Sequence, residues 1–172
     1  MNKQFDYGGW HFDFDKEKTQ LFYSAYHDLC SCASCRNFYA NATSLPVELK
    51  SFLEQFGIDA AKPIEQWSLE ADRAHATVNN AVYYAVTGTA RSNHGRPVDI
   101  GSVEITVMAP SPDDVVHCPE NSPNADIEEP YFMLQLLNLW LPWTVGDDIE
   151  DCYPEPKSFG QRIHALFKRA KK

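Results

Sequence analysis

The sequence lacks any apolar run long enough to cross a membrane, and it lacks a secretory signal at its start. Its longest apolar run, "YFMLQLLNLWL", covers only residues 131–141 and ends at Pro142, whereas a membrane-spanning helix needs about 20 apolar residues. The first residues, "MNKQFDYGGWHFDFD", contain none of the hydrophobic core that a signal peptide requires. These absences predict a protein that has no membrane partner and stays in the cytoplasm.

Cysteine is also scarce, with five residues in the chain, and three of the five fall within residues 30–35. A secreted domain stabilised by disulfides is expected to have more cysteines, in an even number. The cysteine pattern therefore indicates reduced thiols in a reducing cytoplasm.

Cationic residues are few and unevenly placed. The chain has 15 Lys and Arg against 24 Asp and Glu, a formal net charge of −9. Six of the cationic residues lie in residues 157–172, which leaves nine for residues 1–156. This balance argues against a nucleic-acid partner, because nucleic-acid binding usually relies on a broad basic surface. It favours a cationic protein partner, since opposite potentials speed association.

The sequence contains none of the common short motifs that identify a reaction. The patterns GxGxxG, GxxxxGK[ST], HExxH and GxSxG are all absent, so no nucleotide-binding, zinc-protease or serine-hydrolase signature is present. We therefore favour a protein that is not an enzyme.

What the sequence does contain is enough apolar material for one globular domain. The 172 residues are 44% hydrophobic and 13% aromatic, which suits a single folded unit. Strands in hairpins and helices in separate runs predict an α+β domain with a mainly antiparallel sheet. The elements expected are an N-terminal hairpin (10–15 with 20–28), two short helices (36–42, 46–56), a strand (65–72), a second hairpin (80–90 with 102–109), a long acidic proline-rich loop (110–130), a strand (131–145), an acidic loop (146–156) and a basic terminal helix (157–172).

Two of these elements have clear patterns. In "WHFDFD" the aromatic residues alternate with polar ones, which is typical of a half-buried strand. Residues 46–56 place Leu49, Phe52, Leu53 and Phe56 on one helical face. Ser44 is a candidate cap for this helix, and Gly57 is a suitable stop.

The segment with the most chemistry is "HDLCSCASC", residues 27–35, which reads H-x2-C-x-C-x2-C. Cys30, Cys32, Cys35 and His27 are of the residue types that bind zinc, which prefers four sulfur or nitrogen ligands in a tetrahedron. This pattern predicts a structural zinc site. The fourth ligand is His27 or, alternatively, His117, Cys118 or Cys152.

Two other interpretations of the cysteine cluster stay open. Cys32 and Cys35 form a Cys-x2-Cys pair that precedes an expected helix, and a helix N-terminus with Arg36 adjacent favours a reactive thiolate. That arrangement would suit a redox dithiol, although the βαβ context of thioredoxin-type enzymes is not visible. Alternatively, the three thiols are small buried side chains with no reactivity.

The segment "YSAYHDLCSCASCRNFY", followed by "LPVELKSFLEQFGID", resembles a bacterial family of uncharacterised proteins. Members of that family share a Tyr-His-x2-Cys-x-Cys-x2-Cys-x-Asn-aromatic segment, a helix that ends in Leu/Phe-Gly-Ile-Asp, and a late Leu-Pro-Trp, here Leu141, Pro142 and Trp143. The resemblance covers roughly residues 20–72 and 131–145. It implies a small bacterial cytosolic protein and implies no particular activity.

Two functional hypotheses follow. In the first, the protein is a non-enzymatic protein-binding module, for example an immunity or inhibitor protein for a basic toxin, with a structural metal clamp at the cysteines. In the second, it is a thiol-dependent redox enzyme that uses Cys32 and Cys35.

Overall fold

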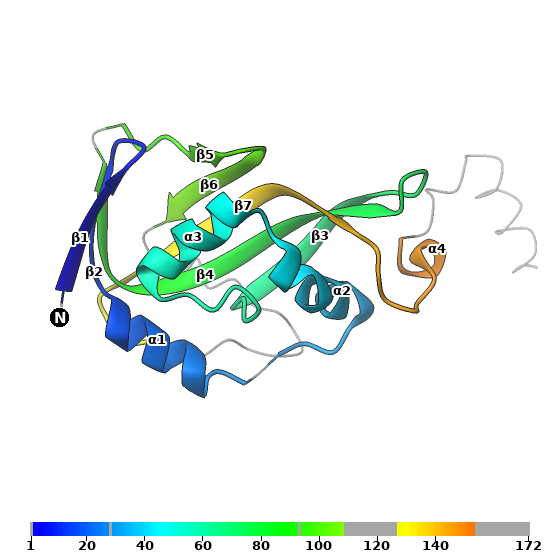
Figure 1. The fold of residues 1–172 in the computed structure, drawn as a ribbon, viewed down its shortest axis with the longest axis horizontal. Helices are drawn as coiled ribbons and strands as arrows, with labels where there is room; N and C mark the ends of the chain where they lie inside the picture. The colour runs from blue at the N-terminus through cyan, green and yellow to red at the C-terminus, as the bar shows by residue number, and fades with distance from the viewer. Residues whose placement is uncertain (1, 28, 93, 109–126, 154–172) are drawn as a thin grey trace, which may run out of the picture.

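The computed structural model describes residues 2–27, 29–92, 94–108 and 127–153 (Figure 1). Seven strands in this part of the chain form an antiparallel sheet in the order β1-β2-β4-β7-β6-β5, and β3 also pairs with β4. The predicted α+β class and mainly antiparallel sheet are confirmed. The strands are β1 (Asn2–Tyr7), β2 (Trp10–Asp15), β3 (Glu65–Asp72), β4 (Thr77–Ser92), β5 (Val98–Ile100), β6 (Val103–Met108) and β7 (Tyr131–Pro142).

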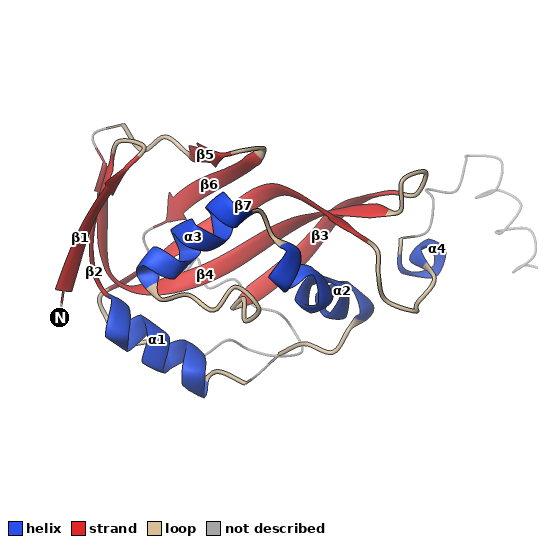
Figure 2. Ribbon diagram, viewed as in Figure 1, coloured by secondary structure: helices blue, strands red, loops and turns tan. Residues whose placement is uncertain are grey.

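Helices α2 and α3 cover one face of this sheet, and α1 lies along one edge of β4 (Figure 2). None of the helices in the described ranges is long and apolar enough to cross a membrane. The predicted helices after the cysteine cluster are confirmed as α2 and α3. The helices are α1 (Lys16–Ala25), α2 (Ala33–Asn41), the 3-10 turn η1 (Ala42–Ser44), α3 (Val47–Phe56) and α4 (Ile149–Cys152).

Strand β4 is the centre of the sheet, and two strands share one of its edges. Residues 77–83 pair with β3 and residues 88–92 pair with β2, while β7 pairs with residues 77–87 on the opposite edge. Between the two shorter partners, no strand from the described ranges lies beside residues 84–87 on the shared edge. Backbone groups left there would need other hydrogen-bonding partners, because burying them unpaired is costly.

Helix α1 supplies those partners through two side chains. The Tyr23 hydroxyl accepts a hydrogen bond from the Ala85 amide (2.9 Å) and donates to the Ala85 carbonyl (3.0 Å). The Thr19 hydroxyl accepts from the Thr87 amide (3.2 Å) and donates to the Asp15 carbonyl (3.0 Å). Both side chains are buried, so α1 completes the hydrogen bonding of the β4 edge.

The strand predicted at residues 20–28 is therefore wrong, because residues 16–25 are helical. The Asp15 carboxylate accepts from the Lys18 amide at 3.1 Å and caps the helix directly after β2. Thr19 and Tyr23 then lie four residues apart on the buried face, while Leu21 is 70% exposed.

An N-terminal hairpin is present, but its partner for residues 10–15 is β1. Gly8 and Gly9 form the turn with φ of +57° and +79°, a conformation at both turn positions that favours glycine.

The second predicted hairpin is also wrong, because β4 and β6 are not neighbours. Strand β7 lies between them and pairs with both, and β6 forms its hairpin with β5 instead. The strand predicted at 65–72 is confirmed, and the one predicted at 131–145 is confirmed over Tyr131–Pro142. The acidic loop contains the short helix α4, which Asp148 caps. Most of the predicted loop at 110–130 and the terminal helix at 157–172 lie outside the described residues.

The core lies between the sheet and the apolar stripe of α3. Leu49, Phe52, Leu53 and Phe56 are all buried, as the sequence predicted. The Phe56 ring lies 4.8 Å from the Phe14 ring and 5.1 Å from the Phe12 ring, between centroids. Gly57 ends the helix at φ +84°. The predicted Ser44 cap is wrong, because Pro46 holds the capping position without a side-chain hydrogen bond.

We predict that Leu53→Ala and Phe56→Ala each lower the free energy of unfolding by about 2–5 kcal/mol, since each truncation leaves a cavity in the core. Val47→Ala on the same helix is the control, because Val47 is 69% exposed; it should change stability by less than about 0.5 kcal/mol. Urea denaturation measures all three. Equal small effects at the three positions would place this helical face outside the core.

We also predict that Tyr23→Phe lowers the free energy of unfolding by about 1–3 kcal/mol, because it leaves the buried amide and carbonyl of Ala85 without a partner. Tyr7→Phe removes the same atom from an exposed tyrosine and should be nearly neutral. Hydrogen exchange of the Ala85 amide gives a local measurement. Unchanged protection in Tyr23→Phe would show that α1 is not the partner of this edge.

Candidate metal centre

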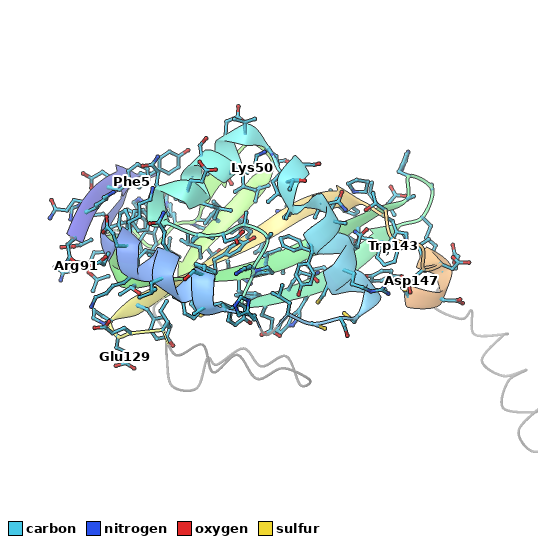
Figure 3. All side chains as sticks on the ribbon, turned by 60° about the horizontal axis from the view of Figure 1, so that its bottom comes forward. Phe5, Lys50, Arg91, Glu129, Trp143 and Asp147 are labelled. Atoms are coloured by element: carbon cyan, nitrogen blue, oxygen red, sulfur yellow. The ribbon has the colours of Figure 1, made fainter. Side chains whose placement is uncertain are left out.

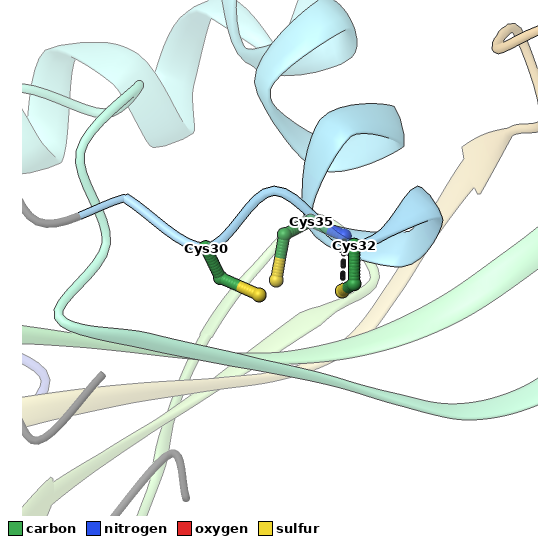
Figure 4. A group of neighbouring side chains, drawn as sticks. All are labelled: Cys30, Cys32 and Cys35. Atoms are coloured by element: carbon green, nitrogen blue, oxygen red, sulfur yellow. Dashed lines mark hydrogen bonds between the residues drawn. The ribbon is translucent and has the colours of Figure 1, made fainter. Parts of the chain in front are cut away.

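Three cysteines meet at the N-terminus of α2 (Figure 4). Cys30 and Cys32 precede the helix, and Cys35 lies in its first turn. The three Sγ atoms all lie within 4.8 Å of one another, and no disulfide joins them. Sulfurs bound to one tetrahedral zinc at 2.3 Å are about 3.8 Å apart. Small side-chain rotations would therefore bring the three sulfurs to the spacing that a metal ion requires.

Cys32 caps the N-terminus of α2, and its side chain contacts the backbone amide of Cys35. Its backbone is extended (φ −64°, ψ 159°), and its Sγ accepts a hydrogen bond from the Cys35 amide at 3.5 Å. A sulfur in this position lies near the positive end of the helix dipole, which stabilises negative charge. The capping position thus holds the Cys32 sulfur, a metal-ligand atom, at the N-terminus of α2.

Helix α2 is fixed on β3 and β4 by a chain of polar side chains. The Ser34 hydroxyl contacts both Gln66 and Ser68 of β3. Gln66 Nε2 donates to Asn80 Oδ1 of β4 at 2.7 Å, and Asn80 Nδ2 donates to the Leu139 carbonyl of β7 at 3.2 Å. Because Ser34 lies between Cys32 and Cys35 in the sequence, this network positions the cysteines relative to three strands.

A second polar group fixes α2 on the segment after β7. Asn37 Nδ2 donates to the Pro142 carbonyl (3.1 Å), and Asn37 Oδ1 accepts from the Thr144 amide (2.7 Å). Asn41 Nδ2 donates to the same carbonyl at 3.1 Å. Asparagine is a poor helix former. Two asparagines four residues apart in an expected helix lie on one face, and this pattern in the sequence could have indicated these hydrogen bonds.

Arg36 joins the same region to the segment before α4. Its guanidinium donates to the Ser31 carbonyl (3.0 Å) and pairs with the Asp147 carboxylate (2.8 Å). Trp143 Nε1 donates to the Asp147 carbonyl at 2.7 Å, and these two residues lie near α4 (Figure 3). The cation that the sequence places beside the thiols is thus engaged by a carboxylate.

Burial controls the ionisation of the innermost thiol. Burial raises the pKa of Cys35 far above its usual range, and the neighbouring Cys32 and Cys30 raise it further. Burial, together with the nearby Cys35, likewise raises the pKa of Tyr39. Without a metal cation Cys35 is therefore a protonated thiol, and a bound cation would be needed to make it a thiolate.

The structure brings together three of the four predicted ligands. His27 is exposed and is not part of the sulfur group, and Cys152 is exposed in α4. The other two candidates, His117 and Cys118, lie outside the described residues. Within the described ranges, no fourth His, Cys, Asp or Glu joins the three sulfurs.

Comparison with known proteins adds no relative. The chain matches no family model, no curated protein and no solved structure. The resemblance to an uncharacterised bacterial family therefore stays a prediction, and the site is interpreted from its geometry alone.

We predict that the metal-free protein loses stability as the pH rises above about 8.5. The unfolded chain then releases the Cys35 proton, whereas the buried thiol keeps it, so the unfolded state is favoured by up to about 1.4 kcal/mol per pH unit. Urea denaturation in chelator between pH 7.5 and 9.5 should show a smaller decline for Cys35→Ala than for the unmodified protein. Identical declines would contradict a buried, protonated Cys35.

Proposed function

We propose that the protein is a non-enzymatic binding protein in which Cys30, Cys32 and Cys35 bind one zinc ion. The observation that supports this is the convergence of three sulfurs within 4.8 Å at the start of α2. Thiolate ligands favour zinc and other soft ions over magnesium or calcium. Because Cys30 and Cys32 precede α2 and Cys35 belongs to it, a shared ion would tie the preceding segment to the helix.

A structural role suits the surroundings of the cluster. Helix α2 is attached through buried amides to β3, β4 and β7, and such a rigid support is typical of a site that stabilises a fold. Zinc at a structural site has all four positions filled. We propose that His27, His117, Cys118 or Cys152 supplies the fourth ligand.

The binding role rests on charge. The net charge of −9 favours a cationic protein as the partner, since complementary potentials speed association and select partners. An inhibitor or immunity protein that binds a basic toxin is one form of this function.

A second candidate function, thiol–disulfide exchange, has one observation in its favour. Cys32 is exposed at the helix N-terminus, while Cys35, three residues later, is buried. In such an exchange the Cys32 thiolate would attack a substrate disulfide, form a mixed disulfide with one of its sulfurs and release the other as a thiolate. Cys35, once deprotonated, would then displace the reduced substrate and leave a Cys32–Cys35 disulfide, which a dithiol reductant must reduce again. The raised pKa of Cys35 and the antiparallel sheet favour the metal site instead.

We predict about one zinc per chain in protein purified without metal-affinity chromatography, measured by elemental analysis. Cys30→Ser, Cys32→Ser and Cys35→Ser should each lose most of this zinc and lower the melting temperature, because the ion contributes to folding. Cys152→Ser is the matched control if the fourth ligand is another residue. His27→Ala tests the first candidate for that position.

Less than about 0.1 zinc or iron per chain would contradict the metal site, because a structural ion is bound too tightly to be lost on purification. A metal-free protein in which a Cys32–Cys35 disulfide forms and is reduced by a dithiol would support the redox function instead.

A further inference from the structure

The sheet face turned away from α2 carries two exposed tryptophans. Gln66 and Ser68 of β3 contact α2, so Trp67 between them points to the opposite face. Trp140 of β7 lies between the buried Leu139 and Leu141 and also points outward. Each indole is 44% exposed. We call the surface formed by Trp67, Glu70 and Trp140, with the buried Asn79 and Ala81 beneath it, the tryptophan face.

The strand register brings these residues together. Trp67 pairs with Ala81, while Glu70 and Trp140 both pair with Asn79 from opposite sides of β4. Directly paired residues share a face of the sheet. The two tryptophans therefore stand on β3 and β7, two strand spacings and two residues apart, or roughly 12 Å between their Cα atoms, with the smaller side chains of β4 between them.

The Trp67 indole is held in one orientation. Its Nε1 donates to Glu65 Oε1 at 2.6 Å, and its ring meets the Tyr83 ring edge-on at 5.8 Å between centroids. The Tyr83 hydroxyl in turn accepts from Gln135 Nε2 at 2.5 Å. An aromatic ring fixed in this way loses little conformational entropy when a partner binds.

The Glu70 carboxylate of this face pairs with no cation in the described part of the chain. Asn79 Nδ2 donates to Glu70 Oε1 at 3.4 Å, which orients Asn79 Oδ1 as an acceptor. Asn79 is only 5% exposed, and its Oδ1 has no hydrogen-bond donor within the described part of the chain. Strands β3 and β7 and residues 77–87 of β4 contain no Lys or Arg, whereas β3 contains Glu65, Glu70 and Asp72.

We propose that the tryptophan face binds an arginine- or lysine-rich segment of a protein partner. Cationic groups are attracted to the faces of indole rings, and the exposed Glu70 carboxylate supplies an acceptor for their N–H donors. Tryptophan is also enriched among the residues that dominate protein interfaces. An apolar partner would leave the Glu70 carboxylate without a cation, so the charge complementarity selects a basic one. This inference rests on the cationic partner of the proposed function and assigns it a surface.

The test uses the full chain and a fluorescein-labelled peptide that alternates five arginines with five glycines, followed by fluorescence anisotropy. The unmodified protein binds this peptide and not the matching glutamate–glycine peptide. Trp67→Ala and Trp140→Ala each weaken binding about tenfold, the upper range for a cation on an indole. Trp67→Phe keeps part of the affinity, and it replaces Trp67→Ala if that variant does not fold.

Matched charge variants separate this face from general attraction. Glu70→Gln lies on the tryptophan face, and Glu54→Gln removes the same charge from an exposed position on α3. Binding weakens several-fold in Glu70→Gln and changes less than twofold in Glu54→Gln. Equal losses in the two variants overturn the proposal, as does a tryptophan variant that binds normally or an unmodified protein that does not bind the peptide.

Zinc content, measured on the same samples, keeps the two proposals apart. A protein that contains zinc and does not bind the peptide overturns only the tryptophan face. A zinc-free protein whose peptide binding depends on Trp67 overturns only the metal site.

Discussion

The fold depends on how the shared edge of β4 is satisfied. Two short strands, β3 and β2, pair with its two ends, and the interval between them is completed by Tyr23 and Thr19 of α1. Two side-chain hydroxyls thus replace the backbone groups of a missing strand segment. This arrangement explains why α1 follows β2 without a loop, since Asp15 both ends the strand and caps the helix. Helix α1 ends at Ala25, and residues 29–32 then lead to the start of α2 at Ala33.

The cysteine cluster depends in turn on the polar contacts of α2. Apolar packing alone tolerates rotation of a helix, whereas hydrogen bonds from Ser34 to β3 and from Asn37 and Asn41 to β7 specify one orientation. Buried polar networks of this kind are stable only when their members are paired. Asn37 and the Pro142 carbonyl, which lie 105 residues apart in the sequence, are in direct contact. The two segments that contain them therefore form one structural unit around the cluster.

Local patterns predicted the elements with regular periodicity and missed those set by distant partners. The α3 stripe, the strands at 10–15, 65–72 and 131–142, and the grouping of Cys30, Cys32 and Cys35 were all visible in the sequence. Phe22 and Tyr23 are aromatic residues that favour a strand, but the unpaired edge of β4, more than 60 residues away in the chain, selects the helix. The position of β7 between β4 and β6 was likewise invisible, because strand order reflects long-range pairing. The position of His27 outside the sulfur group depends on side-chain geometry that spacing alone does not determine.

Strand β3 connects the two proposed sites through its side-chain alternation. Gln66 and Ser68 face α2 and support the cysteine cluster, while Trp67 between them faces the opposite side. A shift of one residue in the pairing of β3 with β4 would exchange these faces, burying the indole under α2 and exposing the amide that positions the cysteines. The irregular pairing between Ser68 and Glu70 brings Glu70 opposite Asn79, on the same face as Trp67. The register of this one edge strand therefore determines both the support of the metal site and the composition of the tryptophan face.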